Sequence, residues 1–246
     1  MKTPMNRSEK QSASSPRALT RRQAVSVLAV GAAGAVVAGC AEIRETPEQY
    51  AVTLCERSAD TVERMKADPN LKALVKHLDT ARAVVVIPHA YRAAFIGGAE
   101  GGSGILMART GGGWGAPAFY TLASGSVGFQ IGIQDAEILL IVRSEKAMNA
   151  ILNHQAKFGA DGGITVGIFG AGVEGSTTTN VGADILAVFR SRIGLYGGVS
   201  LEGGGLIRRN DLNNAVHGAG VEPRAIVQGG GNIFPPADRL RRALGG

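Results

Sequence analysis

The sequence contains few of the residues that perform chemistry in proteins. Among 246 residues it has 2 cysteines and 4 histidines, and aromatic residues make up 5% of the chain. Two cysteines exclude a disulfide framework. No histidine stands at metal-site spacing from another histidine or cysteine, and neither a G-x-x-x-x-G-K-[ST] loop nor a G-x-S-x-G motif occurs. We therefore expect no metal, no cofactor and no enzymatic activity. The alternative is a hydrolase whose catalytic residues come together only in the folded chain.

The first 40 residues have the pattern of a removable leader. Residues 1–19 are polar and basic, Arg21 and Arg22 follow, and the apolar run Ala24–Ala38 leads to Val37-Ala-Gly-Cys40. This order is typical of a secretory signal peptide. Fifteen weakly apolar residues are too few for a membrane span, which needs about 20. The arginine pair leaves both the general and the twin-arginine export routes open.

Val37-Ala-Gly-Cys40 resembles the bacterial lipobox. This resemblance implies that Cys40 becomes the mature N-terminus and carries acyl chains such as palmitate, two or three of which give stable anchoring. Because Ala41 rather than aspartate follows, it also implies delivery to the outer membrane of the cell envelope, facing the periplasm. We expect a signal peptide at 1–39, an acylated tether at 40–46, a domain at 47–218 and a C-terminal tail at 219–246.

The net charge of +6 belongs almost entirely to this leader. Residues 1–40 hold six basic residues and one acidic residue, which leaves 20 basic and 19 acidic residues in the rest of the chain. A nearly neutral domain argues against nucleic-acid binding, which needs a basic face to replace counterions.

Residues 47–80 are predicted to form two helices. Thr46 and Pro47 suit the start of the first helix, Asp68-Pro69 ends it, and Asn70 is expected to cap a second helix at 71–78. Apolar residues recur at three and four positions, which predicts one buried face. Cys55 belongs to this face and is interpreted as a small apolar residue rather than a reactive thiol. Charged residues such as Arg57 and Arg64 are expected on the solvated face.

From Ala83 onward, short apolar runs alternate with glycine-rich turns. Strands are predicted at 83–87 (ended by Pro88), 91–97, 104–109, 118–123, 126–133, 137–142, 163–170, 184–190, 195–201 and 205–208, with helices from Ser144 to about Lys157 and at 211–216. Of the 36 glycines, 26 lie between Gly97 and Gly205. Glycine within strands indicates bulges, bends or close approach. We predict an α+β fold: a curved or partly closed, barrel-like antiparallel sheet, with the N-terminal helices and one or two further helices packed on it.

One motif has two interpretations. Gly170-Ala-Gly-Val-Glu-Gly175 satisfies the G-x-G-x-x-G pattern of dinucleotide-binding proteins. That function needs a helix to begin at the motif, and Ser176-Thr-Thr-Thr-Asn180 is a poor helix start. A loop or hairpin is the favoured interpretation.

Five motifs in order resemble the SYLF domain, also called the Ysc84 actin-binding family, over residues 45–218. They are Ala83-Val-Val-Val-Ile-Pro88, Gly101-Gly-Ser-Gly-Ile-Leu106, Gly113-Trp-Gly-Ala-Pro-Ala-Phe119, Gly128-Phe-Gln-Ile-Gly132 and Ser191-Arg-Ile-Gly-Leu-Tyr-Gly-Gly-Val-Ser-Leu-Glu-Gly203. Eukaryotic members bind phosphoinositide membranes, and some bind actin. The resemblance implies a non-enzymatic lipoprotein that contacts a phospholipid membrane and has no small-molecule substrate. The alternative is an envelope structural or adaptor protein that binds another protein through its sheet surface.

Five side chains are candidates for lipid contact. Arg190 and Arg192 could bind phosphate bidentately, although an ion pair with Asp184 or Glu202 is the competing interpretation. Lys72, Lys76 and His77 lie on the second predicted helix and could contact lipid headgroups. The alternative is that they belong to the solvated face of that helix. Trp114, the single tryptophan, could lie at the membrane interface or pack under the sheet.

Overall fold

The computed structural model describes residues 45–94, 97–111, 113–127, 132–153, 157–158, 163–169, 182–193, 204–230 and 233–245. For 92–94, 97–100, 125–127, 132–134 and 192–193 it describes the backbone alone. Several sequence predictions lie wholly or partly outside the described residues: the leader with Cys40, the centre of the strand predicted at 126–133, the Gly170–Gly175 motif, the strand at 195–201 and the candidate ion-pair partner Glu202.

The predicted N-terminal helix is α2, Pro47–Ala67. The Thr46 side chain accepts a hydrogen bond from the Gln49 backbone N–H, and the Gln49 side chain accepts one from the Thr46 N–H, so a reciprocal capping box begins the helix. The structure differs from the prediction at the next cap. Asp68 rather than Asn70 caps the short 3₁₀ helix η1, Pro69–Leu71, and α3 follows at Leu74–Asp79.

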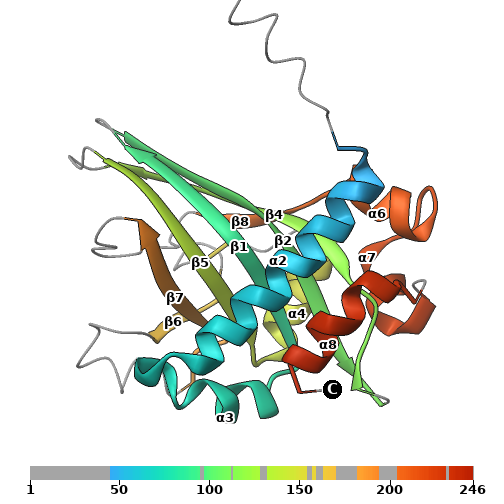
Figure 1. Cartoon of the computed structure of the whole chain (residues 1–246), viewed down its shortest axis with the longest axis horizontal. Helices are drawn as coiled ribbons and strands as arrows, with labels where there is room; N and C mark the ends of the chain where they lie inside the picture. The colour runs from blue at the N-terminus through green and yellow to red at the C-terminus, as the bar shows by residue number, and fades with distance from the viewer. Residues whose placement is uncertain are drawn as a thin grey trace, which may run out of the picture. The chain divides into compact units, whose positions relative to one another are not determined.

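A single sheet forms the centre of the domain. Its strands run in the order β6-β7-β5-β1-β2-β4-β8, with β3 paired to β2. Their bounds are β1 Ala83–Ala94, β2 Gly97–Thr110, β3 Gly113–Trp114, β4 Ala118–Val127, β5 Gly132–Val142, β6 Val166–Phe169, β7 Ile185–Ile193 and β8 Gly205–Arg208. The pairings are antiparallel except β6–β7, which is parallel. The sheet curls without closing, because β6 and β8 remain its two ends (Figure 1).

Pro88 does not end the first strand, as the sequence suggested. β1 continues to Ala94 through a bulge. Val86 and Tyr91 pair with Ile105 and Gly101 of β2, so four residues of β1 lie opposite three residues of β2. The pairing of β1 with β5 shifts at the same place, between Ile87 and Ala90. Proline has no N–H to offer either neighbour, so a bulge is the place where a central strand tolerates it.

Helices cover both faces of the sheet (Figure 1). On one face α2, α3 and α6 (Asn210–His217) pack over alternate strand residues such as Val84, Val86 and Leu139. On the other face α4, Glu145–Leu152, packs over Val85, Leu140 and their neighbours. Ser144 caps α4 as predicted, but the helix ends at Leu152, well before Lys157. These strands have buried side chains on both faces, which explains their continuous apolar runs.

The segment predicted as a polar tail is part of the core. Residues 219–246 include α7 (Pro223–Ala225), η3 (Ile226–Gly230), η4 (Pro235–Ala237) and α8 (Asp238–Ala243). Leu240 and Leu244 are buried with the residues of α2. Lys66 on α2 donates a hydrogen bond to the Ala243 carbonyl at 2.8 Å. The segment was predicted to be a polar tail because its three arginines outnumber the few apolar residues of α8 that enter the core.

The predicted fold class, α+β with a partly closed sheet, is confirmed. Residues 45–246 form one compact unit by themselves. Among the described residues, no helix has both the length and the hydropathy to cross a bilayer.

Candidate functional site

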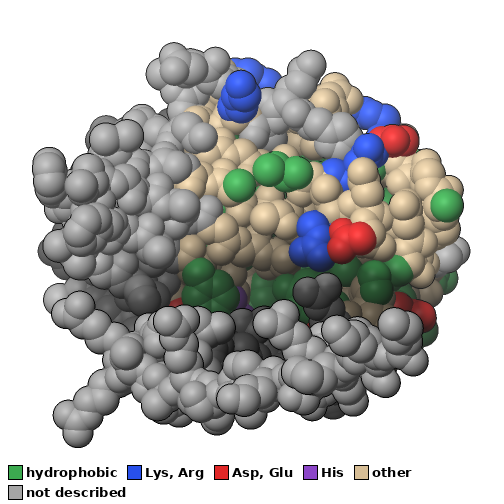
Figure 2. Space-filling model, turned by 90° about the horizontal axis from the view of Figure 1, so that it is seen from above, with side chains coloured by type: hydrophobic (Ala, Val, Ile, Leu, Met, Phe, Trp, Pro, Cys, Tyr) green, Lys and Arg blue, Asp and Glu red, His purple; other side chains and the backbone are tan. Residues whose placement is uncertain are grey.

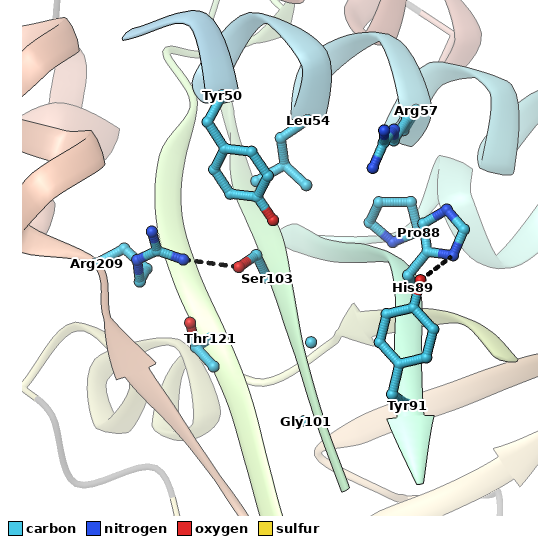
Figure 3. Close-up of a pocket in the computed structure, with 11 residues that line it drawn as sticks. Tyr50, Leu54, Arg57, Pro88, His89, Tyr91, Gly101, Ser103, Thr121 and Arg209 are labelled. Carbon is cyan, nitrogen blue, oxygen red and sulfur yellow. Dashed lines mark hydrogen bonds between the residues drawn. The ribbon is translucent and has the colours of Figure 1, made fainter. Parts of the chain in front are cut away.

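A cleft opens between the first half of α2 and the bulged part of the sheet (Figure 3). Its volume is about 390 Å³, within the range of small-molecule sites. α2 forms one wall with Tyr50, Leu54 and Arg57, and the bulge of β1 forms another. The remaining lining comes from β2, from β4 and from Arg209, which follows β8.

One end of the cleft is held by Arg209. Its guanidinium donates to both carboxylate oxygens of Asp211, at 2.8 and 2.7 Å, and to the Ser103 hydroxyl on β2 at 2.8 Å. The hydrogen bonds to Asp211 raise the pKa of Arg209, and Arg209 in turn lowers the pKa of Asp211. The guanidinium also lies over the Tyr50 ring, 5.6 Å from its centre. This end is therefore fixed, and its positive charge is neutralised locally.

The opposite end contains His89 and Tyr91 from the β1 bulge. The two rings stack at a centroid distance of 5.7 Å, and the Tyr91 hydroxyl lies 3.4 Å from His89 Nδ1. The same nitrogen lies 3.1 Å from an Asp135 carboxylate oxygen. Tyr91 itself is 57% exposed. The bulge thus places an exposed aromatic ring at the mouth of the cleft.

Arg57 lies above Pro88 and His89 (Figure 3). Its side chain is exposed and forms no ion pair with any residue that the structure describes. None of the described residues that line the cleft is acidic. Arg57 thus offers an uncompensated guanidinium to an anion.

Gly102 permits the close approach of the two strands that form the cleft floor. A Cβ on Gly102 would lie 2.1 Å from the His89 carbonyl oxygen and 2.8 Å from Ile87 Cγ2. The bulge in β1 therefore requires a residue without a side chain at this position of β2.

Arg190 is occupied by a structural ion network. Glu137 on β5 has no exposed surface, and its carboxylate accepts from Arg190 at 3.0 Å, from Arg64 at 2.5 Å and from the Thr61 hydroxyl at 3.2 Å. Arg190 also lies 3.7 Å from Asp68. The competing interpretation was an ion pair with Asp184 or Glu202. Among the described residues Arg190 forms its ion pairs with Glu137 and Asp68 and none with Asp184, and Glu202 lies outside the described residues. Arg64, expected on the solvated face, also contributes to this network.

Two of the other basic candidates, Lys72 and Lys76, do not line the cleft. Lys72 and Lys76 are exposed and form no ion pair with described residues. His77 packs edge-on against Phe169 with ring centres 5.5 Å apart, and burial, with Arg143 and Lys76, lowers its pKa. Arg192 belongs to β7, and its side chain lies outside the described part. On the face shown in Figure 2, the coloured charged groups are scattered rather than gathered into one patch.

Trp114 packs in the core. It is 5% exposed, its indole N–H donates to the Leu244 carbonyl at 3.3 Å, and Arg109 lies over its ring at 4.7 Å. The alternative interpretation, packing under the sheet, describes this position. In this conformation the ring is not available to a bilayer.

Neither the one described cysteine nor any cluster of potential metal ligands suggests reactive chemistry in the described residues. Cys55 is fully buried in α2, and burial raises the pKa of its thiol to about 12. Within the described ranges, no three His, Cys, Asp or Glu side chains come close enough to hold a metal ion.

Of the five lipid-contact candidates, the four whose side chains the structure describes do not line the cleft, and sequence reasoning did not identify its residues. Arg57 belongs to a helix face with mixed charges, and Arg209 lies at a junction between two elements. The one available signal was Pro88 within a strand-like run, because a proline there marks a bulge.

Comparison with known proteins identifies relatives. A sequence model of the Ysc84 family, described as Las17-binding protein actin regulator, matches residues 123–246. SH3 domain-containing YSC84-like protein 1 of Xenopus laevis is 32% identical over 169 residues, which are 68% of this chain and 50% of that protein. The human protein of that name is 31% identical over 160 residues, 64% of this chain and 46% of that protein. Protein YSC84 of Saccharomyces cerevisiae is 27% identical over 171 residues, which are 68% of this chain and 36% of that protein. The chain spans half or less of the length of these curated relatives.

Proposed function

Because this chain belongs to the Ysc84 (SYLF) family, we propose that it is a lipid-anchored, non-enzymatic protein of the cell envelope whose folded domain binds phospholipid headgroups. The names of its relatives describe SH3-domain-containing and Las17-binding proteins. None of these names denotes an enzyme.

The cleft is the observation that carries the proposal. One cavity is lined by an exposed arginine that forms no ion pair with described residues, by aromatic side chains and by several hydroxyl groups, and its described lining residues include no carboxylate. Arginine binds phosphate oxygens through paired, charge-assisted hydrogen bonds. Tyrosine suits a membrane interface because its ring is apolar and its hydroxyl is polar.

The expected anchor supports the same placement. Cys40 lies five residues before Glu45, where the described domain begins. Five residues of fully extended chain span no more than about 18 Å. Acyl chains on Cys40 would therefore keep Glu45, two residues before α2 begins, within that reach of the bilayer. We propose the outer membrane, facing the periplasm, as the location.

Co-sedimentation with vesicles tests this function. Residues 41–246, which lack the acylated cysteine, would be mixed with phosphatidylcholine vesicles with and without an anionic lipid across a salt series. We expect binding that requires the anionic lipid and weakens as salt rises, since screening acts on exposed charges. Equal binding to neutral vesicles, or none to any composition, would contradict headgroup binding by the domain.

A second candidate is an envelope adaptor that binds another protein. Ile207 on β8 is 59% exposed at one end of the sheet, and exposed apolar side chains at a sheet edge favour contact with a second chain. A photo-reactive residue at position 207, activated in intact cells, tests this candidate. Cross-linking that depends on the 207 position would support it, and its absence would argue against it.

A further inference from the structure

We propose that the cleft binds a phosphate ester of a neutral polyol, such as a phosphoglycerol group, with Arg57 on the phosphate and the Ser103–Arg209 end on the polyol hydroxyls. This inference rests on the proposed function and names the ligand chemistry of its site. The two ends of the cleft differ in charge, and this difference selects the ligand.

Arg57 supplies the anion-binding end. It is exposed at the cleft, forms no ion pair with the described residues and faces no lining carboxylate. A guanidinium in this state exchanges water for phosphate oxygens without first breaking a salt bridge. At this end Asp135 lies 3.1 Å from His89 Nδ1, and among the described residues no ion pair joins Asp135 to Arg57.

Arg209 does not supply a second phosphate ligand. Two hydrogen bonds go to Asp211 and a third goes to Ser103, so three of its five N–H groups are engaged and its charge is already paired with a carboxylate. A second phosphate at this end would compete with that bidentate carboxylate for the guanidinium charge. The geometry therefore points to one phosphate group in the cleft rather than two.

The Arg209 end presents neutral hydroxyl groups. The Ser103 oxygen accepts from Arg209, which leaves its proton free to donate. Thr121 on β4 makes no side-chain hydrogen bond with the described residues, and Figure 3 shows the Tyr50 hydroxyl directed toward Ser103. Hydroxyls both donate and accept, which matches the hydroxyls of a polyol.

The lining also disfavours a cationic headgroup. An ammonium group needs carboxylates or an aromatic cage. The described lining holds two arginines and no acid, and its two tyrosine rings already contact Arg209 and His89. A choline, ethanolamine or serine headgroup would place its amine near a guanidinium. Among lipids of equal charge, the cleft therefore favours a glycerol headgroup over a serine headgroup.

The test compares two arginine variants of residues 41–246. Arg57→Gln removes the proposed phosphate ligand, and Arg242→Gln is the matched control. Arg242 is also an exposed arginine on a helix, is not in the cleft and forms no ion pair with the described residues. Circular dichroism would first establish that both variants fold. Binding would be measured on vesicles that contain phosphatidylglycerol or, at the same mole fraction, phosphatidylserine.

We expect the unaltered domain to prefer phosphatidylglycerol, Arg57→Gln to lose about tenfold of that affinity, and Arg242→Gln to retain it. Ser103→Ala should reduce the preference for phosphatidylglycerol over phosphatidylserine without weakening binding to phosphatidylserine. Equal losses for Arg57→Gln and Arg242→Gln, or equal binding of the two lipids, would overturn the inference. Anionic-vesicle binding would in that case still support the proposed function.

A soluble probe separates the two sources of such a ligand. Calorimetry with sn-glycerol 3-phosphate measures the cleft without a membrane. Arg57-dependent binding of this probe by a domain that binds no vesicle would support the site but contradict the membrane function. Absence of binding to both the probe and the vesicles would overturn both proposals.

Discussion

Replacement of Gly102 by alanine tests whether the bulge and β2 pack as closely as the structure indicates. The new Cβ would lie 2.1 Å from the His89 carbonyl oxygen and 2.8 Å from Ile87 Cγ2, whereas real Cβ atoms essentially never come closer than 3.0 Å to another atom. The closest obstacle is backbone and not the end of a flexible side chain. One of the two strands must therefore move by close to an ångström.

The expected cost is that of an overpacked core. Such substitutions destabilise by about 1–3 kcal/mol. For a domain of this size, each kcal/mol lowers the melting temperature by about 2–4 °C. Gly111→Ala is the matched control, because a Cβ at Gly111 meets nothing within 4 Å. Thermal unfolding followed by circular dichroism should place Gly102→Ala about 2–12 °C below this control.

The binding assay gives a second measurement on the same variant. Displacement of the bulge moves His89 and Tyr91, which line the cleft, so phosphatidylglycerol binding should weaken in Gly102→Ala. Equal melting temperatures for Gly102→Ala and Gly111→Ala would refute the close approach of β1 to β2.

Three other predictions concern the core. Leu240→Ala should cost about 2–4 kcal/mol and shift the fluorescence of Trp114 to the red, because both side chains share one core; Ile233→Ala, at a residue 83% exposed, should change neither. Glu137→Ala should cost about 2–3 kcal/mol in urea unfolding, since it removes the acidic partner of Arg64 and the closer of the two acids that Arg190 contacts. A loss no larger than that of Glu63→Ala, which removes a surface pair with Arg239, would contradict the network. Burial lowers the pKa of His217 below 6.5, so the unfolded chain takes up a proton that the folded chain does not, and stability falls as pH decreases through that region. His217→Gln should lose less stability between about pH 7.5 and pH 5 than the unaltered domain, and an unchanged pH dependence would argue against this role for His217.

Local sequence signals determined much of the secondary structure. Thr46 and Ser144 cap the helices that they were expected to cap, and β8 has the predicted bounds. A cap depends on hydrogen bonds within four residues, which the sequence contains in full. The prediction of β1 was less accurate, because only the pairing with β2 and β5 shows that the strand continues through Pro88.

The candidate lipid contacts were less predictable than the elements. Trp114 and Arg190 were selected by residue type, but their environment depends on distant partners. Leu244 is 130 residues from Trp114, and Glu137 is 53 residues from Arg190. The local sequence does not distinguish an arginine in an ion network, such as Arg190, from an exposed arginine without an ion pair to described residues, such as Arg57.

The sequence by itself determined the leader pattern, the family resemblance, the helix starts and the mixed α and β composition, because each follows from short-range order or from ordered motifs. The tertiary structure decided which charges are neutralised. It brought Glu137 between Arg64 and Arg190, and it gave Arg209 its partners Ser103 and Asp211. It left Arg57 over the bulge of β1 without an ion pair to any described acid. Electrostatic interactions depend on distance in space and on burial. The sequence therefore shows which residues are charged, but the tertiary structure is needed to know which charges lie close enough to pair.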